Sequence, residues 1–233
     1  MSDRVFDELR DVKLEIPYTS STPGSVLISM GRTKVLCTAS VQSDVPRWMR
    51  ESGKGWVTAE YGMLPGSSNE RVRRDHIEGG RAKEISRLIG RSLRAVVDLK
   101  AMGEAMAIVD CDVIEADGGT RTASITGAWI ALHYAFVDAV DRGVMASSPL
   151  IDEVAAVSVG IVDGKPMLDL DYEKDVAAEV DMNVVMSGRG LLVEVQGTAE
   201  RAPFTRSELE QLLDLAAAGI NELHDLQRRA VAE

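Results

Sequence analysis

A glycine-rich stretch near the middle of the chain, ADGGTRTASITGA (residues 116–128), has the composition of an anion-binding turn. Its two glycines are followed by an arginine and by the hydroxyls of Thr120, Thr122, Ser124 and Thr126. Glycine allows a tight turn and the close approach of a ligand to the backbone, and the free amides of a helix N-terminus attract anions. The stretch therefore predicts a phosphate site, or else an ordinary helix start preceded by a flexible turn.

A second candidate for chemistry is the acidic run LDLDYEKDVAAEVDMNVV (residues 168–185). Carboxylates alternate along an expected strand at positions 169 and 171, and others follow at 175, 179 and 181. Carboxylates near a strand end can hold Mg²⁺ or Mn²⁺, or one of them can act as a general acid. The alternative is a solvated acidic turn, and we expect Asp169 to be a solvated residue of the strand.

A basic segment lies within a chain whose net charge is −11. Residues 71–94 hold eight basic and three acidic residues, whereas residues 151–233 hold 17 acidic and 7 basic ones. A local basic patch matters more for nucleic-acid binding than the total charge does. We expect Arg71, Arg73 and Arg74, in a polar loop, to contact RNA phosphates.

The elements that must position these residues follow from the hydrophobic pattern. Short stretches rich in branched residues, bounded by Gly or Pro, predict strands at 11–18, 24–31, 33–41, 55–63, 104–116, 153–162, 165–172, 180–187 and 191–199. Apolar residues at helical spacing predict helices at 83–100, 121–141 and 203–231. Strands followed by helices, twice over, predict an α+β fold of two similar βαβ-type halves, residues 1–150 and 151–233.

The remaining sequence features indicate a cytoplasmic globular protein. Cys37 and Cys111 stand in strand-like contexts without CxxC spacing, which is typical of buried, reduced thiols. The first ten residues are too polar for a signal peptide. We expect no membrane span, because even residues 123–140 carry Ser, Thr, His and Asp.

Several motifs, in order along the chain, resemble the ribonuclease PH family. They are GSVLISMGRTKVLCTAS, GWVTAEYGMLP, GGRAKEISRLIGRSLRAVVDLKAMGE, DCDVIEADGGTRTASITGA, AAVSVGIVDG and DMNVV…VEVQGTAE. The resemblance implies a phosphate-dependent exoribonuclease (a tRNA nucleotidyltransferase) that trims the 3′ ends of tRNA precursors and other RNAs. It also implies a homo-hexameric ring built as a trimer of dimers.

The resemblance assigns roles to individual residues. Phosphate binding falls on Arg81, Gly119, Thr120 and Arg121, with inorganic phosphate as the co-substrate. Catalysis and the binding of Mg²⁺ or Mn²⁺ fall on Asp175 and Asp181, whose separate roles the sequence leaves open. The chain departs from the family pattern at its start, MSDRVFDELR, which lacks an Arg-rich segment ending in GR, and in a shorter loop between residues 65 and 79.

Two other functions are compatible with parts of the sequence. A catalytically silent, RNA-binding ring subunit would need neither the arginines nor the carboxylates, yet all six assigned residues are present. A hydrolytic, metal-dependent nuclease would use water, whereas the paired arginines suit bound phosphate better. Both alternatives predict that no nucleoside diphosphate is formed.

Overall fold

The computed structural model describes residues 4–74, 79–201 and 203–232. Its first half contains a five-stranded sheet in the order β1-β2-β3-β5-β4. The strands are β1 (Val12–Glu15), β2 (Gly24–Met30), β3 (Thr33–Gln42), β4 (Trp56–Met63) and β5 (Met106–Glu115). The β4 and β5 strands are parallel and are joined through α1 (Gly80–Arg94), so this half contains a βαβ unit, while the other strand pairs are antiparallel.

The second half contains a four-stranded antiparallel sheet in the order β7-β6-β8-β9. Its strands are β6 (Val154–Val162), β7 (Lys165–Leu168), β8 (Val180–Ser187) and β9 (Leu192–Ala199), with α3 (Tyr172–Ala177) between β7 and β8. Because β7 and β8 both run antiparallel to the β6 strand between them, β7-α3-β8 is a split βαβ unit. The predicted α+β fold of two βαβ-type halves is confirmed.

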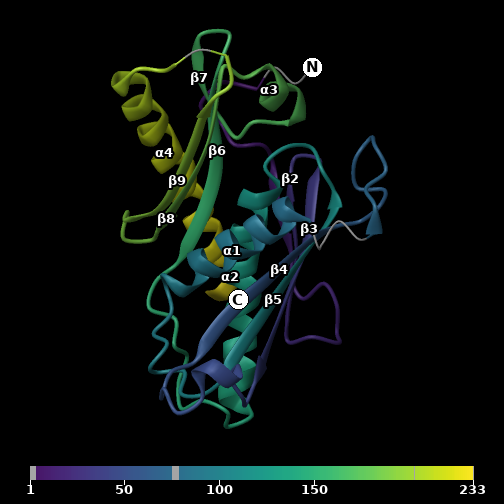
Figure 1. Ribbon diagram of the computed structural model, residues 1–233, viewed down its shortest axis with the longest axis vertical. Coiled ribbons are helices and arrows are strands. Elements are labelled where there is room, and N and C mark those ends of the chain that lie inside the picture. Colours follow the sequence, from purple (N-terminus) through teal and green to yellow (C-terminus); the bar gives the residue numbers. More distant parts are fainter. Residues whose placement is uncertain (1–3, 75–78, 202, 233) are drawn as a thin grey trace.

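Two long helices complete the core. The α2 helix (Thr120–Asp141) packs on β2, β3 and β5 of the first sheet and on β6 of the second, and the run from Thr122 to Leu132 is entirely buried. The α4 helix (Arg206–Ala232) packs on β6, β7, β8 and α2. In Figure 1 the four-stranded sheet and the start of α4 occupy the upper part, and the five-stranded sheet the lower part. The first turn of α2 therefore begins where both halves meet.

Within the described ranges, α2 is the single helix that is long and apolar enough to cross a membrane by length and composition. Length and composition alone therefore do not exclude a membrane span, although none is expected from the sequence. However, 72% of its apolar window is buried inside the molecule, as expected for a core helix between two sheets. Cys37 and Cys111 are free and buried as predicted, on paired positions of β3 and β5.

Three local predictions differ from the structure. The first long helix ends at Arg94 rather than at residue 100, because Val97 forms a β-bridge with Leu150. The strand expected over 165–172 ends at Leu168, because Asp169 has a left-handed backbone with a φ of 54°. Two short helices, η1 (Arg47–Met49) and α3, were not predicted, since neither is long enough to show helical periodicity.

Candidate active site

All six residues assigned to phosphate and catalysis line one cavity of about 620 Å³. Arg81, Gly119, Thr120 and Arg121 come from the first half of the chain, and Asp175 and Asp181 come from the second. The cavity therefore combines cationic groups and a helix start from one half with carboxylates from the other. Eleven further residues line it, among them Ser158, Asn183, Glu200 and Arg201, which the sequence did not single out.

The glycine-rich turn has the backbone that its sequence predicts. Gly118 and Gly119 both have left-handed backbones, with φ of 77° and 65°, and Gly119 caps α2. A Cβ on Gly118 would lie 2.5 Å from the carbonyl oxygen of Leu170, so a larger residue cannot fit there. The helix begins at Thr120, so the amides of its first turn have no carbonyl acceptor within the helix. Such a turn favours an anion.

The two arginines occupy the starts of two different helices. Arg81 is exposed at the second position of α1, and Arg121 is at the second position of α2. Arg121 is more firmly held, because its Nη1 donates to Oε1 of Gln196 at 3.1 Å and lies 3.6 Å from a carboxylate oxygen of Glu84. Its side chain is 19% exposed, so its charge faces the cavity with limited screening by water.

Tyr61 supports the site from outside the cavity lining, through a contact with Thr120 that sequence reasoning missed. Its ring is buried, as its position on a strand predicts, but its hydroxyl shares a 2.8 Å hydrogen bond with Oγ1 of Thr120. Burial raises the pKa of the Tyr61 hydroxyl. The neutral hydroxyl therefore fixes the Thr120 side chain at the mouth of α2. A buried tyrosine needs a polar partner, but the sequence does not indicate which one.

The carboxylates of Asp175 and Asp181 occupy α3 and the second position of β8. Burial raises the pKa of Asp175, although Arg81 and Arg121 oppose the shift. Burial, followed by repulsion from Asp175, raises the pKa of Asp181 to about 6, again against the two arginines. The pair is thus close enough to interact electrostatically, and one member holds a proton more readily than an ordinary aspartate does.

A divalent cation would offer these carboxylates another way to relieve their repulsion. The described residues contain no group of three or more His, Cys, Asp or Glu side chains that could hold a metal ion. Mg²⁺, however, is usually bound through one or two carboxylates together with substrate phosphates and water. A pair of desolvated carboxylates beside an anion site therefore fits a Mg²⁺ or Mn²⁺ ion that is completed by the substrate.

The predicted RNA-contacting arginines lie apart from this cavity. Arg71, Arg73 and Arg74 are exposed in the loop between β4 and α1 and do not belong to the cavity lining. Ser68, earlier in the same loop, does line the cavity. The loop therefore starts at the cavity, and its three arginines lie outside the lining. Residues 75–78, the last part of the predicted basic loop, lie outside the described residues.

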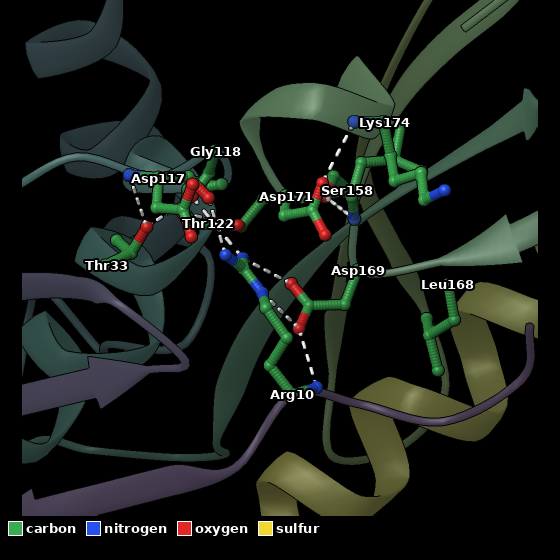
Figure 2. A network of polar contacts seen from close by, with 12 residues as sticks. Arg10, Thr33, Asp117, Gly118, Thr122, Ser158, Leu168, Asp169, Asp171 and Lys174 are labelled. Atoms are coloured by element: carbon green, nitrogen blue, oxygen red, sulfur yellow. Dashed lines mark hydrogen bonds and ion pairs between the residues drawn. The ribbon is translucent and has the colours of Figure 1, made fainter. Parts of the chain in front are cut away.

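The expectation that Asp169 is a solvated strand residue is wrong. Its side chain is fully buried, and both of its carboxylate oxygens accept hydrogen bonds from Arg10 (Figure 2). Arg4 adds a third ion-pair contact at 3.3 Å. The alternation of charges suggested an exposed strand face, but the left-handed backbone at Asp169 turns its side chain inward, toward partners about 160 residues earlier in the chain.

The chain was compared with known families, curated proteins and solved structures. Residues 8–138 match domain 1 of the 3′ exoribonuclease family, and residues 152–219 match its domain 2. A ribonuclease PH from Methylobacterium radiotolerans is 57% identical, and one from Caulobacter vibrioides is 56% identical; the matches cover 99% of this chain and 99% and 98% of those proteins. An Archaeoglobus fulgidus exosome structure with RNA bound to the active site superposes with a TM-score of 0.80 at 21% identity, covering 95% of this chain and 90% of that one.

Proposed function

The chain belongs to the 3′ exoribonuclease family, and we propose that it shortens RNA from the 3′ end by phosphorolysis. It is a phosphate-dependent exoribonuclease of the ribonuclease PH type that processes tRNA precursors and releases nucleoside 5′-diphosphates. The observation that carries this proposal is the convergence of two arginines, a glycine-capped helix start and two carboxylates on one cavity. Two arginines at a helix start suit a bound phosphate co-substrate better than a water nucleophile.

Inorganic phosphate binds at the first turn of α2. The backbone at Gly119 and Thr120 receives it, and Arg81 and Arg121 neutralise its charge so that it can approach the polyanionic RNA. The support is the left-handed glycine pair, the uncapped amides of α2 and the limited solvent exposure of Arg121. A phosphate anion held in this way is a substrate of the reaction, and it also balances the positive charge of the two arginines.

The reaction exchanges one phosphorus–oxygen bond for another. A phosphate oxygen attacks the phosphorus of the last 3′–5′ phosphodiester, and the bond from that phosphorus to the 3′-oxygen of the preceding nucleotide breaks. The terminal nucleotide leaves as a nucleoside 5′-diphosphate, and the shortened RNA gains a proton on its 3′-oxygen. Because the bond formed in the nucleoside diphosphate is a phosphoanhydride, whose free energy offsets that of the broken phosphodiester, the reaction is reversible.

The two carboxylates supply the proton and the site for a cation. We assign the proton to Asp181, whose pKa of about 6 lies near the working pH of a cytoplasmic enzyme. Asp175 would hold Mg²⁺ or Mn²⁺, with Asp181 as a second ligand only while it is ionised, and the bound ion would neutralise charge on the phosphoryl oxygens. These roles divide the chain into two parts. Residues 1–150 bind phosphate, and residues 151–233 carry the carboxylates.

The body of the RNA and the neighbouring subunits lie beyond the cavity. Arg71, Arg73 and Arg74 guide the RNA through contacts with its phosphates, which carry no sequence information. The enzyme assembles as a homo-hexameric ring, a trimer of dimers; solved structures with this fold include an archaeal exosome core. Its tRNA substrates and its two buried free thiols support a cytoplasmic location.

Product analysis tests the proposal. A short RNA with a labelled 3′-terminal nucleotide is incubated with the enzyme and Mg²⁺, with and without inorganic phosphate. We expect the label to appear as nucleoside diphosphate, and only when phosphate is present. Release of nucleoside monophosphate without phosphate would identify a hydrolase, and no release in either case would identify a silent subunit.

A further inference from the structure

A buried ion pair joins the N-terminal segment to the two sides of the active site. The guanidinium of Arg10 donates from Nε to Oδ2 of Asp169 at 2.9 Å and from Nη2 to Oδ1 at 2.7 Å. The backbone amide of Arg10 also donates to Oδ2, at 2.9 Å. Arg10 is 9% exposed and Asp169 is fully buried, so Asp169 compensates the charge of Arg10, while Arg10 and Arg4 together compensate that of Asp169.

The remaining donors of Arg10 hold the phosphate-binding turn. Nη1 donates to the carbonyl oxygen of Asp117 at 2.6 Å, and Nη2 lies 3.4 Å from that of Gly118. Thr33 secures the same turn, because its hydroxyl donates to the carbonyl oxygen of Gly118 at 2.6 Å and accepts from the amide of Asp117 at 2.9 Å. Two consecutive residues before the start of α2 are thus fixed through their backbone groups (Figure 2).

Asp169 belongs to the segment that carries the catalytic carboxylates. It lies between β7 and α3, and its amide donates to the carbonyl oxygen of Ser158 at 2.7 Å. Two residues later, Asp171 caps α3 by accepting from the amide of Lys174, which sets the start of the helix that bears Asp175. The turn and this segment are in direct contact, because a Cβ on Gly118 would lie 2.5 Å from the carbonyl oxygen of Leu170.

We propose that Arg10 and Asp169 are positioning residues that lock the phosphate-binding turn against the carboxylate-bearing segment. Neither residue lines the active-site cavity, so they act through the residues they hold. Arg10 is the bridge, since one guanidinium contacts both the Asp169 carboxylate and the carbonyls of the turn. Loss of the bridge would let the turn shift relative to Asp175 and Asp181. The inference rests on the proposed function, because it assumes that the turn binds phosphate.

The Arg10→Lys variant is the sharpest test of the lock. Lysine keeps the positive charge beside Asp169, but it lacks the fork that reaches the carboxylate and the turn together. We expect the KM for phosphate to rise by about tenfold or more, since small misplacements in an active site are costly. The KM for a short RNA should stay within about twofold, because the RNA is bound largely outside the turn.

Arg32→Lys is the matched control. Arg32, on the β2–β3 turn, lines the same surface pocket as Arg10, but its side chain is 70% exposed and pairs with Glu115 at 3.5 Å. The same chemical change there should leave both KM values unchanged. An unchanged phosphate KM in Arg10→Lys, or equal losses toward phosphate and RNA, would overturn the proposal, since equal losses indicate a merely structural role.

A second variant keeps the test decisive if Arg10→Lys does not fold. Thr33→Val removes the other anchor of the turn without unpairing a buried charge. It should also raise the phosphate KM, by a smaller factor than Arg10→Lys. An unchanged phosphate KM would again refute the proposal that these contacts hold the turn in place. The proposed function itself fails only if the wild-type enzyme shows no phosphate-saturable release of nucleoside diphosphate, so the two failures are distinguishable.

Discussion

Replacing Asp181 with asparagine should stabilise the fold at neutral and alkaline pH while it abolishes turnover. The folded protein raises the pKa of this carboxyl from 3.8 to about 6, chiefly by burial and by the nearby Asp175. Above pH 6 the wild-type protein must therefore ionise Asp181 in an unfavourable site, whereas asparagine stays neutral. Such a cost is expected where a carboxylate is retained for chemistry rather than for stability.

The magnitude follows from the size of the shift. A rise of about two pK units corresponds to roughly 3 kcal/mol of unfavourable free energy. Because Asp181 is only partly buried, screening by solvent reduces the expected gain in the free energy of unfolding to about 1–2 kcal/mol at pH 8.

The sign of the pH dependence is fixed by the direction of the shift. Well below pH 3.8 the carboxyl is protonated in both the folded and the unfolded protein, so the stability difference that depends on its charge should vanish. As the pH rises from about 3 to 6, the unfolded chain ionises first, and the cost to the wild-type fold grows. The difference should be about half of its final value at pH 5 and constant above about pH 7.

Denaturant unfolding at pH 5, 6.5 and 8, at one protein concentration, measures this difference through the fluorescence of the three tryptophans. Asp214→Asn, on the exposed face of α4, is the control and should change stability by less than about 0.5 kcal/mol at every pH. A variant at Asp181 that is less stable than the wild type, or whose gain does not vary with pH, would refute the reasoning.

Three further predictions concern phosphate, the metal ion and RNA. Arg121→Ala should raise the phosphate KM steeply and leave RNA binding mostly intact; steady-state kinetics against phosphate would show an unchanged KM if Arg121 lies outside the phosphate site. After removal of metal with a chelator, Asp175→Asn should need about tenfold or more Mg²⁺ to recover activity, and an unchanged metal titration would exclude Asp175 as a ligand. Replacing Arg71, Arg73 and Arg74 together with alanine should flatten the salt dependence of RNA binding by about one unit of log–log slope per lost contact, without impairing phosphorolysis of a very short RNA. If light scattering shows that this variant loses its ring while the salt slope is unchanged, the loop is an assembly element.

Local patterns in the sequence were sufficient to predict most of the fold. The alternation in β3 is regular, with every second side chain buried from Thr33 onward, and the two-residue turn after Met30 ends at the predicted place. The start of α4 has a reciprocal cap between neighbouring residues, in which Glu208 accepts from the amide of Thr205 at 2.6 Å and the Thr205 hydroxyl accepts from the amide of Glu208 at 3.2 Å. These features depend on neighbours within a few residues, so one sequence reveals them.

The contacts that organise the site join residues far apart in the chain. Tyr61 meets Thr120, Gln196 meets Arg121, and Arg10 meets Asp169, across 59, 75 and 159 residues. No local spacing encodes such pairs, and the charge pattern around Asp169 suggested an exposed position. The glycine pair could be predicted as an anion-binding turn, but the residues that hold that turn in place became visible only in the folded chain.

The most direct test of phosphorolysis follows the attacking phosphate itself. Radiolabelled inorganic phosphate is added to the wild-type enzyme with an unlabelled RNA, and the nucleotide products are separated. If a phosphate oxygen attacks the terminal phosphodiester, every nucleotide released should be a diphosphate carrying one labelled phosphate, in the β position. Release of unlabelled nucleoside monophosphates would show that water is the nucleophile and would contradict the proposed function.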